Sequence, residues 1–152
     1  MAKPRIVVAV DESSGARKAF EWAVNHAQLH GAKLEVVRVY QVMSGSLPQA
    51  SVDATGGEPL LAGVEDEAGL AAETFLKGLV ADVPADVEVE TVVVRGRPAT
   101  ELLRRAEGAR MIVVGSRGRG GFKGLLLGSV SQQVVQHAPC PVTVIPASAA
   151  RR

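Results

Sequence analysis

The chain has 152 residues, of which 47% are hydrophobic, 22% charged and only 3% aromatic, and this composition excludes an intrinsically disordered protein. Lysine and arginine number 17 against 16 acidic residues, and a formal net charge of +1 argues against nucleic acid as the main partner, because nucleic-acid-binding domains carry a basic excess. We expect one domain over residues 1–152, with a core of Val, Leu, Ile and Ala.

Five short segments rich in Val and Ile are predicted β-strands. Unbroken apolar runs of this length are typical of strands that are buried on both faces of a parallel sheet. In chain order they are Ile6–Val10, Lys33–Val39, Val87–Val94, Met111–Val114 and Val142–Ile145.

The segments between these strands have helical periodicity. In the first, apolar residues from Ala16 to Ala27 recur every three or four positions, Ser13 or Ser14 can cap the start, and Gly31 ends the helix. Further helices are predicted over Ala62–Val80, Pro98–Glu107 and Ser129–Ala138. We expect the second to bury Val64, Ala68, Ala71, Phe75 and Leu79, and the third to bury Ala99, Leu102, Leu103 and Ala106.

Strands that alternate with helices predict an α/β fold with a parallel sheet and helices on both faces. The segment Gln41–Leu61 interrupts this order with glycines, prolines, serine and threonine, so we interpret it as a long variable loop that a partner or ligand could order. The tail Ala147–Arg152 is expected to be frayed.

The cysteine content and the N-terminus bear on the compartment. The one cysteine, Cys140, cannot form an intrachain disulfide, and we expect it to be a buried small side chain. The apolar run behind the basic N-terminus covers only Ile6–Val10, which is shorter than the apolar region of a signal peptide, and no stretch is long enough to cross a membrane. We therefore predict a cytoplasmic protein without a membrane partner.

The segment Gly115–Ser131 (GSRGRGGFKGLLLGSVS), between the fourth strand and the last helix, carries the chemistry. Glycines permit positive φ and close approach of a ligand, a turn of exposed N–H groups binds anions, and a helix N-terminus adds partial positive charge. The segment also contains the hydroxyls of Ser129 and Ser131 and the cations Arg117, Arg119 and Lys123. Together these groups predict a polyphosphate site.

The segment Gly115–Ser131 does not match two common nucleotide-binding motifs. It is not a Walker A loop, because Lys123 precedes Gly124 rather than Ser or Thr, and its G-x-G-x-x-x-G spacing is one residue too long for a dinucleotide fingerprint. A purely structural alternative is a capping box between Ser129 and Gln132, with solvated arginines in an ordinary glycine loop.

The pattern Gly115-x2-Gly118-x9-Gly128-Ser129 resembles the nucleotide-binding signature of ATP-type universal stress proteins. The resemblance covers Lys3–Pro146 apart from the loop after Tyr40. It is supported by four further matches: Ile6–Asp11 as first strand, Gly96-Arg-Pro98 before the third helix, Met111–Ser116 and Pro139–Ile145 as last strands.

This resemblance implies a sheet of order 3-2-1-4-5, with Asp11 and Gly115 at the mouth of one crevice at the switch point. It places adenine beside Val10, Asp11 and the Val39 backbone. The ribose and phosphates would lie along Gly115, Ser116, Gly118, Arg119, Gly128, Ser129, Val130 and Ser131. ATP, with ADP or AMP as alternatives and Mg²⁺ or Mn²⁺ on the phosphates, is the implied ligand. A homodimer is implied through the fifth strand, Val142, Thr143, Val144 and Ile145.

Some polar residues receive a structural interpretation. Asp11 is either a cap of the first helix or a nucleotide contact, and Arg95 and Arg97 are interpreted as solvated side chains. His26 and His30 lack a third ligand, so no metal site is predicted there, and His137 suits a helix C-terminus.

No catalytic set is apparent in the sequence. The preferred hypothesis is an ATP-binding regulatory protein of the stress response, whose nucleotide alters its dimer surface or partner binding. The alternatives are a slow ATP hydrolase or nucleotidyl transferase, and a nucleotide-free interaction module.

Overall fold

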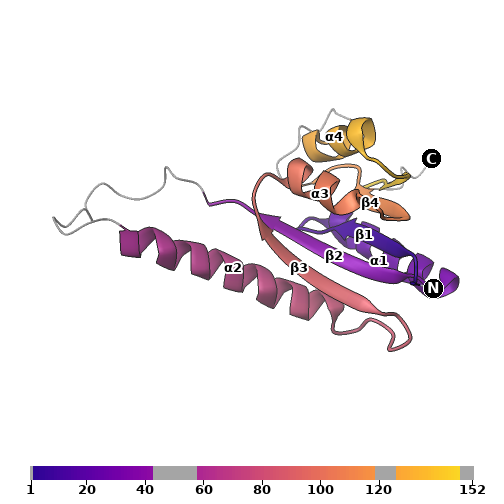
Figure 1. The fold of residues 1–152 in the computed structure, drawn as a ribbon, viewed down its shortest axis with the longest axis horizontal. Helices are drawn as coiled ribbons and strands as arrows, with labels where there is room; N and C mark the ends of the chain where they lie inside the picture. The colour runs from indigo at the N-terminus through magenta and orange to yellow at the C-terminus, as the bar shows by residue number, and fades with distance from the viewer. Residues whose placement is uncertain (1, 43–57, 119–125, 148–152) are drawn as a thin grey trace.

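The computed structural model of the protein describes residues 2–42, 58–118 and 126–147. Five strands form one parallel sheet of order β3-β2-β1-β4-β5, which confirms the predicted topology (Figure 1). The strands are β1 (Arg5–Ala9), β2 (Lys33–Tyr40), β3 (Val89–Arg95), β4 (Met111–Gly115) and β5 (Val142–Ile145). β1 lies at the centre and pairs with β2 on one side and with β4 on the other.

Four described helices cover the two faces of the sheet. They are α1 (Ser14–His30), α2 (Glu58–Val80), α3 (Pro98–Ala106) and α4 (Ser129–His137). Helices α1 and α2 pack on one face and α3 and α4 on the other, as the ribbon shows (Figure 1). None of the helices in the described part of the chain is both long enough and apolar enough to span a bilayer.

The capping signals of α1 act as the sequence predicts. The Ser13 hydroxyl accepts a hydrogen bond from the Ala16 N–H at 3.1 Å, and Gly31 ends the helix with a φ of 60°. Only glycine adopts this left-handed conformation without steric cost. The helix start is thereby fixed directly after the end of β1, beside the mouth of the sheet.

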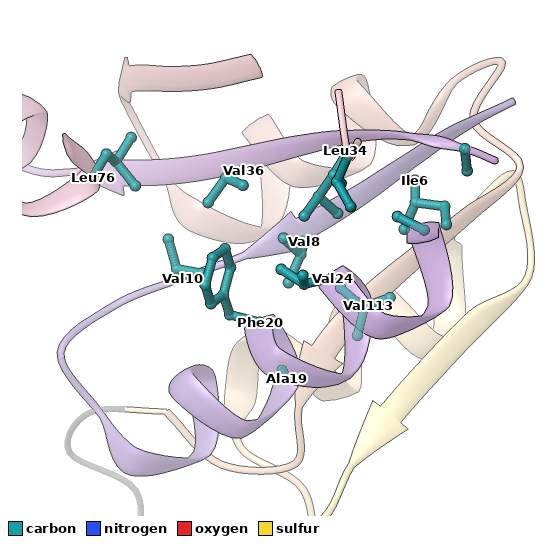
Figure 2. Close-up of a cluster of buried hydrophobic side chains, with 14 residues drawn as sticks. Ile6, Val8, Val10, Ala19, Phe20, Val24, Leu34, Val36, Leu76 and Val113 are labelled. Carbon is teal, nitrogen blue, oxygen red and sulfur yellow. The ribbon is translucent and has the colours of Figure 1, made fainter. Parts of the chain in front are cut away.

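The core consists of two clusters, one on each face. Alternate residues of each central strand point to opposite faces, so Val8 and Val36 contact the α1 side while Val7 and Val37 contact the α3 side. In Figure 2, the first cluster extends from Leu76 of α2 at one end to Leu34 and Ile6 at the other, with Phe20 of α1 between them beside Val10. Strands β1 and β4 are covered on both faces, which explains their unbroken apolar runs Ile6–Ala9 and Met111–Val114.

Several boundaries and faces differ from the sequence prediction. Helix α2 begins at Glu58, so residues 58–61 are helical rather than loop, while 43–57 lie outside the described residues. Its fully buried residues are Ala72 and Leu76, and the predicted Phe75 and Leu79 are half-buried and pack on the same core cluster. Ala68 is half-buried and Ala71 is exposed, and the side chain of Val64 lies outside the described residues. The prediction is therefore confirmed at Phe75 and Leu79 and wrong at Ala71, because Ala71 and Ala72 are both apolar and the sequence pattern does not decide which of them faces the sheet. Strand β3 begins at Val89 rather than Val87, and Leu103 is only half-buried.

Candidate functional site

A cleft of about 620 Å³ opens where β1, β2 and β4 end. Its position is the switch point of the sheet, where open α/β folds bind ligands. Nine of the eleven residues that the sequence predicts as nucleotide contacts line it: Val10, Asp11, Val39, Gly115, Gly118, Gly128, Ser129, Val130 and Ser131. Of the other two, Ser116 lies buried beneath the cleft and Arg119 lies outside the described residues.

The backbone of Val39 faces the cleft because β1 is shorter than β2. The β1–β2 register ends with Ala9 opposite Val37, and the Val37 carbonyl accepts the last bond, from the Val10 N–H. Hydrogen-bonding groups alternate sides along a strand, and the Tyr40 carbonyl points the other way, to the Gly96 N–H beyond β3. The N–H and C=O of Val39 therefore point past the end of β1 into the cleft.

Asp11 bonds to the N-cap residue of α1 and also faces the glycine-rich segment. Its Oδ1 accepts a hydrogen bond from the Ser13 N–H at 2.8 Å, so Asp11 caps the turn before the helix, while Ser13 caps the helix itself. A Cβ placed on Gly118 would lie 3.1 Å from Asp11 Oδ2. One oxygen of the Asp11 carboxylate thus accepts a hydrogen bond from the backbone, and the other lies close to Gly118, where any larger side chain would contact the carboxylate.

The three described glycines of this segment, Gly115, Gly118 and Gly128, serve close approach rather than unusual torsion angles. In the described residues, positive φ occurs at Gly31, Gly96 and Gly108, and not at Gly115, Gly118 or Gly128. A Cβ on Gly115 would lie 3.0 Å from the carbonyl carbon of Gly15, and a Cβ on Gly15 would lie 2.9 Å from the carbonyl oxygen of Arg117. The start of α1 and the end of β4 therefore pack backbone against backbone.

The N-terminus of α4 opens into the cleft. Gly128 is its N-cap residue, and no described side chain caps the helix, so the predicted Ser129–Gln132 capping box is wrong. The reason is that Ser129 is already the first helical residue, one position too late to act as the cap. Helix N–H groups of the first turn and the positive end of the helix dipole are thus presented to the cleft.

The two hydroxyls at the start of α4 have different roles. Ser131 is buried, and its Oγ donates to the Ser116 carbonyl at 2.8 Å. Ser129 is exposed on the cleft wall. A hydroxyl has a single proton to donate, so Ser129 is the better-placed donor for an anion.

Side chains that the sequence reasoning did not identify complete the walls. Arg38 lines the cleft, with its Nη2 2.7 Å from Glu12 Oε1 and its guanidinium carbon 5.6 Å from the centre of the Phe75 ring. The apolar wall is built by Tyr40, Ala68, Ala72, Pro98 and Leu102. The Gly-x-Pro before α3 was a signal for Pro98, whereas nothing local predicted the Arg38–Glu12 pair.

The remaining polar residues lie elsewhere. His26 stacks on Trp22 at 4.7 Å between ring centres, and His30 lies 4.2 Å from His26. Burial, followed by the charges of His30 and Arg110, lowers the pKa of His26. The described residues contain no cluster of three metal-ligating side chains. Arg95 and Arg97 are exposed and do not line the cleft, and burial raises the pKa of Cys140.

Both fold and sequence identify the family of this chain. The model of the universal stress protein family matches residues 4–146, and the protein belongs to that family. A universal stress protein from Thermus aquaticus, encoded in the QAH/OAS sulfhydrylase 3′ region, is 36% identical over 142 residues, covering 92% of this chain and 96% of the relative.

Solved structures share the whole fold. The universal stress protein UspA from Lactobacillus plantarum has a TM-score of 0.74 and 29% identity, covering 95% of this chain and 99% of its own. An Arabidopsis thaliana family protein with AMP bound has a TM-score of 0.61, and an Archaeoglobus fulgidus universal stress protein in complex with dAMP one of 0.60. Each of these two is 22% identical, and the alignments cover 96% and 95% of this chain and 93% and 99% of the other.

Proposed function

We propose that this universal stress protein binds an adenine nucleotide, ATP in preference, in the cleft at the ends of β1 and β4, and acts as a regulatory protein of the stress response. The observation that carries the proposal is the convergence of the Val39 backbone, Asp11, Gly118 and the α4 N-terminus on one cavity. Nucleotide complexes of proteins with the same fold, with AMP and with dAMP, support it.

The base would lie against β2. The Val39 N–H and C=O form an adjacent donor and acceptor, which complement N1 and the N6 amino group of adenine. Apolar side chains, among them Ala72 and Leu102, form walls of the same cavity, and flat bases favour such surroundings. The cleft thus combines a hydrogen-bonding edge with an apolar slot.

The phosphates would lie at the start of α4. The first-turn N–H groups, the Ser129 hydroxyl and the close backbone of Gly118 form a cradle for an anion, and Arg117 on the cleft wall adds positive charge. The dipole of α4 favours the same negative charge.

Asp11 would act between the base and the phosphates. A carboxylate is a poor neighbour for a phosphate unless a ribose hydroxyl or a divalent cation lies between them. Asp11 Oδ2 could accept from a ribose hydroxyl or supply one oxygen to Mg²⁺ or Mn²⁺, with phosphates and water completing the coordination. The cation would neutralise phosphate charge.

The edge strand β5 is the proposed dimer interface. Val142, Thr143, Val144 and Ile145 are all half-buried, and the strand pairs with β4 along one side. Its other side is an edge that a second copy of the chain could cover. A cytoplasmic location remains a prediction of the sequence.

Calorimetry with ATP, ADP and AMP in Mg²⁺ buffer tests the proposal. Ser129→Ala and Gly118→Ala should weaken ATP binding roughly five- to twentyfold, because one loses a donor to a charged group and the other crowds Asp11. Gln133 is an exposed residue of the same helix that does not line the cleft, so Gln133→Ala should bind ATP with wild-type affinity. Absence of binding in the unchanged protein would contradict the proposal, and ATP turnover in the same samples would favour a slow hydrolase.

A further inference from the structure

The residue that joins the cleft to the end of the chain is Ser116, directly after β4. It is one of three buried polar or charged residues in the described part of the chain, and it does not line the cleft. Its hydroxyl accepts a hydrogen bond from the Ala147 N–H at 3.0 Å. The resemblance placed this residue among the nucleotide contacts, whereas the geometry directs its side chain to the segment after β5.

Three more hydrogen bonds meet at the same residue. On the side of α4, the Ser116 carbonyl accepts from the Gly128 N–H at 2.7 Å and from the Ser131 hydroxyl at 2.8 Å. On the side of β5, the Ser116 N–H donates to the Ile145 carbonyl at 2.8 Å. One residue is therefore bonded both to the start of α4 and to the end of the edge strand.

The segment after β5 is anchored on its other side as well. The Ala147 carbonyl accepts from Lys18 Nζ of α1 at 2.8 Å, and a Cβ on Gly15 would lie 3.7 Å from the Ala147 side chain. Ala147, which the sequence assigns to a frayed tail, is thus held between α1 and the end of β4. Residues 148–152 lie outside the described part of the chain.

Ser116 has little room to shift. A Cβ on Gly15 would lie 2.9 Å from the Arg117 carbonyl oxygen, so the residue after Ser116 lies close to the α1 backbone, and the bonds from Gly128 and Ser131 fix the Ser116 carbonyl. A shift of Ser116 would therefore change the α4 start and the Ala147 contact together. Binding of a ligand at the α4 start and the hydrogen bond to Ala147 both require the same placement of Ser116. Each therefore stabilises the other, and this coupling is reciprocal.

We propose that Ser116 is a positioning residue of the nucleotide site, and that through it nucleotide binding and the anchoring of Ala147 beyond β5 are coupled. The inference rests on the proposed function, because the α4 start is where the phosphates would lie. It assigns the Ser116 hydroxyl to the chain after β5 rather than to the ligand. The edge strand proposed for dimer contact ends two residues before Ala147, so the coupling would carry nucleotide occupancy to that edge.

Amide hydrogen exchange, measured residue by residue by NMR, tests the coupling in the full chain. In the unchanged protein, saturating Mg-ATP should slow exchange at the Ala147 amide about threefold or more. In Ser116→Ala this slowing should disappear, and calorimetry should show ATP binding weakened about three- to tenfold. Thr91→Val removes a hydroxyl on the opposite edge strand β3, and it should change neither the slowing of exchange at Ala147 nor the ATP affinity.

A second variant removes the same hydrogen bond from its other side. Ala147→Pro lacks the N–H donor but leaves the Ser116 side chain in place, so it should weaken ATP binding as Ser116→Ala does. If Ser116→Ala fails to fold, the ATP affinity of Ala147→Pro still tests the coupling. Unchanged exchange at Ala147 in a protein that binds ATP, or full ATP affinity in Ala147→Pro, would overturn the coupling alone. No ATP binding by the unchanged protein would overturn the proposed function and the coupling together.

Discussion

The Ser131 hydroxyl donates to the Ser116 carbonyl at 2.8 Å, whereas Ser129, two residues earlier on α4, is exposed on the cleft wall. Two serines of one helical turn therefore have separable functions. We expect Ser131→Ala to lower the free energy of unfolding by about 1–2 kcal/mol, because a buried carbonyl loses a partner. Ser129→Ala should leave stability unchanged and weaken ATP binding. Urea denaturation and calorimetry on both variants measure the difference, and equal stability losses would contradict it.

Two helical glycines should respond oppositely to alanine. A Cβ on Gly15 would lie 2.9 Å from the Arg117 carbonyl oxygen, so Gly15→Ala should destabilise the protein by about 1–3 kcal/mol. Gly78 of α2 has nothing within 4 Å of its Cβ position, so Gly78→Ala should stabilise by about 0.5–1 kcal/mol. Thermal unfolding should show a lower melting temperature for Gly15→Ala and a higher one for Gly78→Ala. A stable Gly15→Ala would show that α1 can move away from β4.

The ion pairs of Glu35 should differ in strength. Glu35 is 4% exposed, and its Oε2 lies 2.9 Å from Arg5 Nη1, while its Oε1 lies 3.4 Å from Arg105 Nη1. Arg5 also donates to the carbonyls of Arg105 and Glu107. Arg5→Ala should therefore lower the free energy of unfolding by about 3 kcal/mol or more, because it leaves the buried Glu35 carboxylate without its nearest cation. Arg105→Ala should lower it less.

These two variants are best compared by urea denaturation at one pH and salt concentration. Because the pair lies at the amino ends of the strands, away from the cleft, ATP affinity should stay unchanged in whichever variant remains folded. A larger loss from Arg105→Ala than from Arg5→Ala would contradict the assignment.

The His26 imidazole should make stability depend on pH. Its pKa lies below the ordinary value of 6.5, mainly because of burial against Trp22 and the helix, so the unfolded chain binds the proton more readily. The stabilising contribution of neutral His26 is then present above pH 6.5 and is lost as the pH falls from 6.5 through the lower folded-state pKa.

Melting temperatures measured between about pH 7.5 and 5 test whether stability falls toward acid pH, because this range brackets the ordinary pKa of histidine. His26→Gln should flatten the decline toward acid pH, whereas His137→Gln, on the exposed end of α4, should keep it. A decline that is equally steep in His26→Gln would assign the pH dependence to other groups.

The sequence was informative where a residue's role is local or follows from a long motif. Ser13 and Gly31 mark the ends of α1 through their own side chain or torsion angle, and the apolar runs identify the strands. The strand order came from the family resemblance, since periodicity alone does not say which strands are neighbours.

What could not be predicted depends on contacts between distant segments. The direction of the Ser116 hydroxyl is set by Ala147, 31 residues away, and the Arg38–Glu12 pair joins β2 to the residues that follow β1. On α2 the sequence predicts Ala71 as buried where the structure buries Ala72, because Leu70, Ala71 and Ala72 are all apolar and only packing against the sheet selects Ala72. The capping-box prediction is wrong because α4 begins at Ser129, one residue earlier than a helix capped by Ser129 would begin.

The end of β1 two residues short of Val39 has a consequence for how the cleft evolves. The groups that face the opening there belong to the main chain, and every amino acid except proline supplies the same pair. Selectivity for a base edge would then be encoded by strand length rather than by residue identity. Position 39 is free to drift among residues that suit a strand, whereas a one-residue insertion in β1 would erase the recognition edge without altering a single cleft side chain.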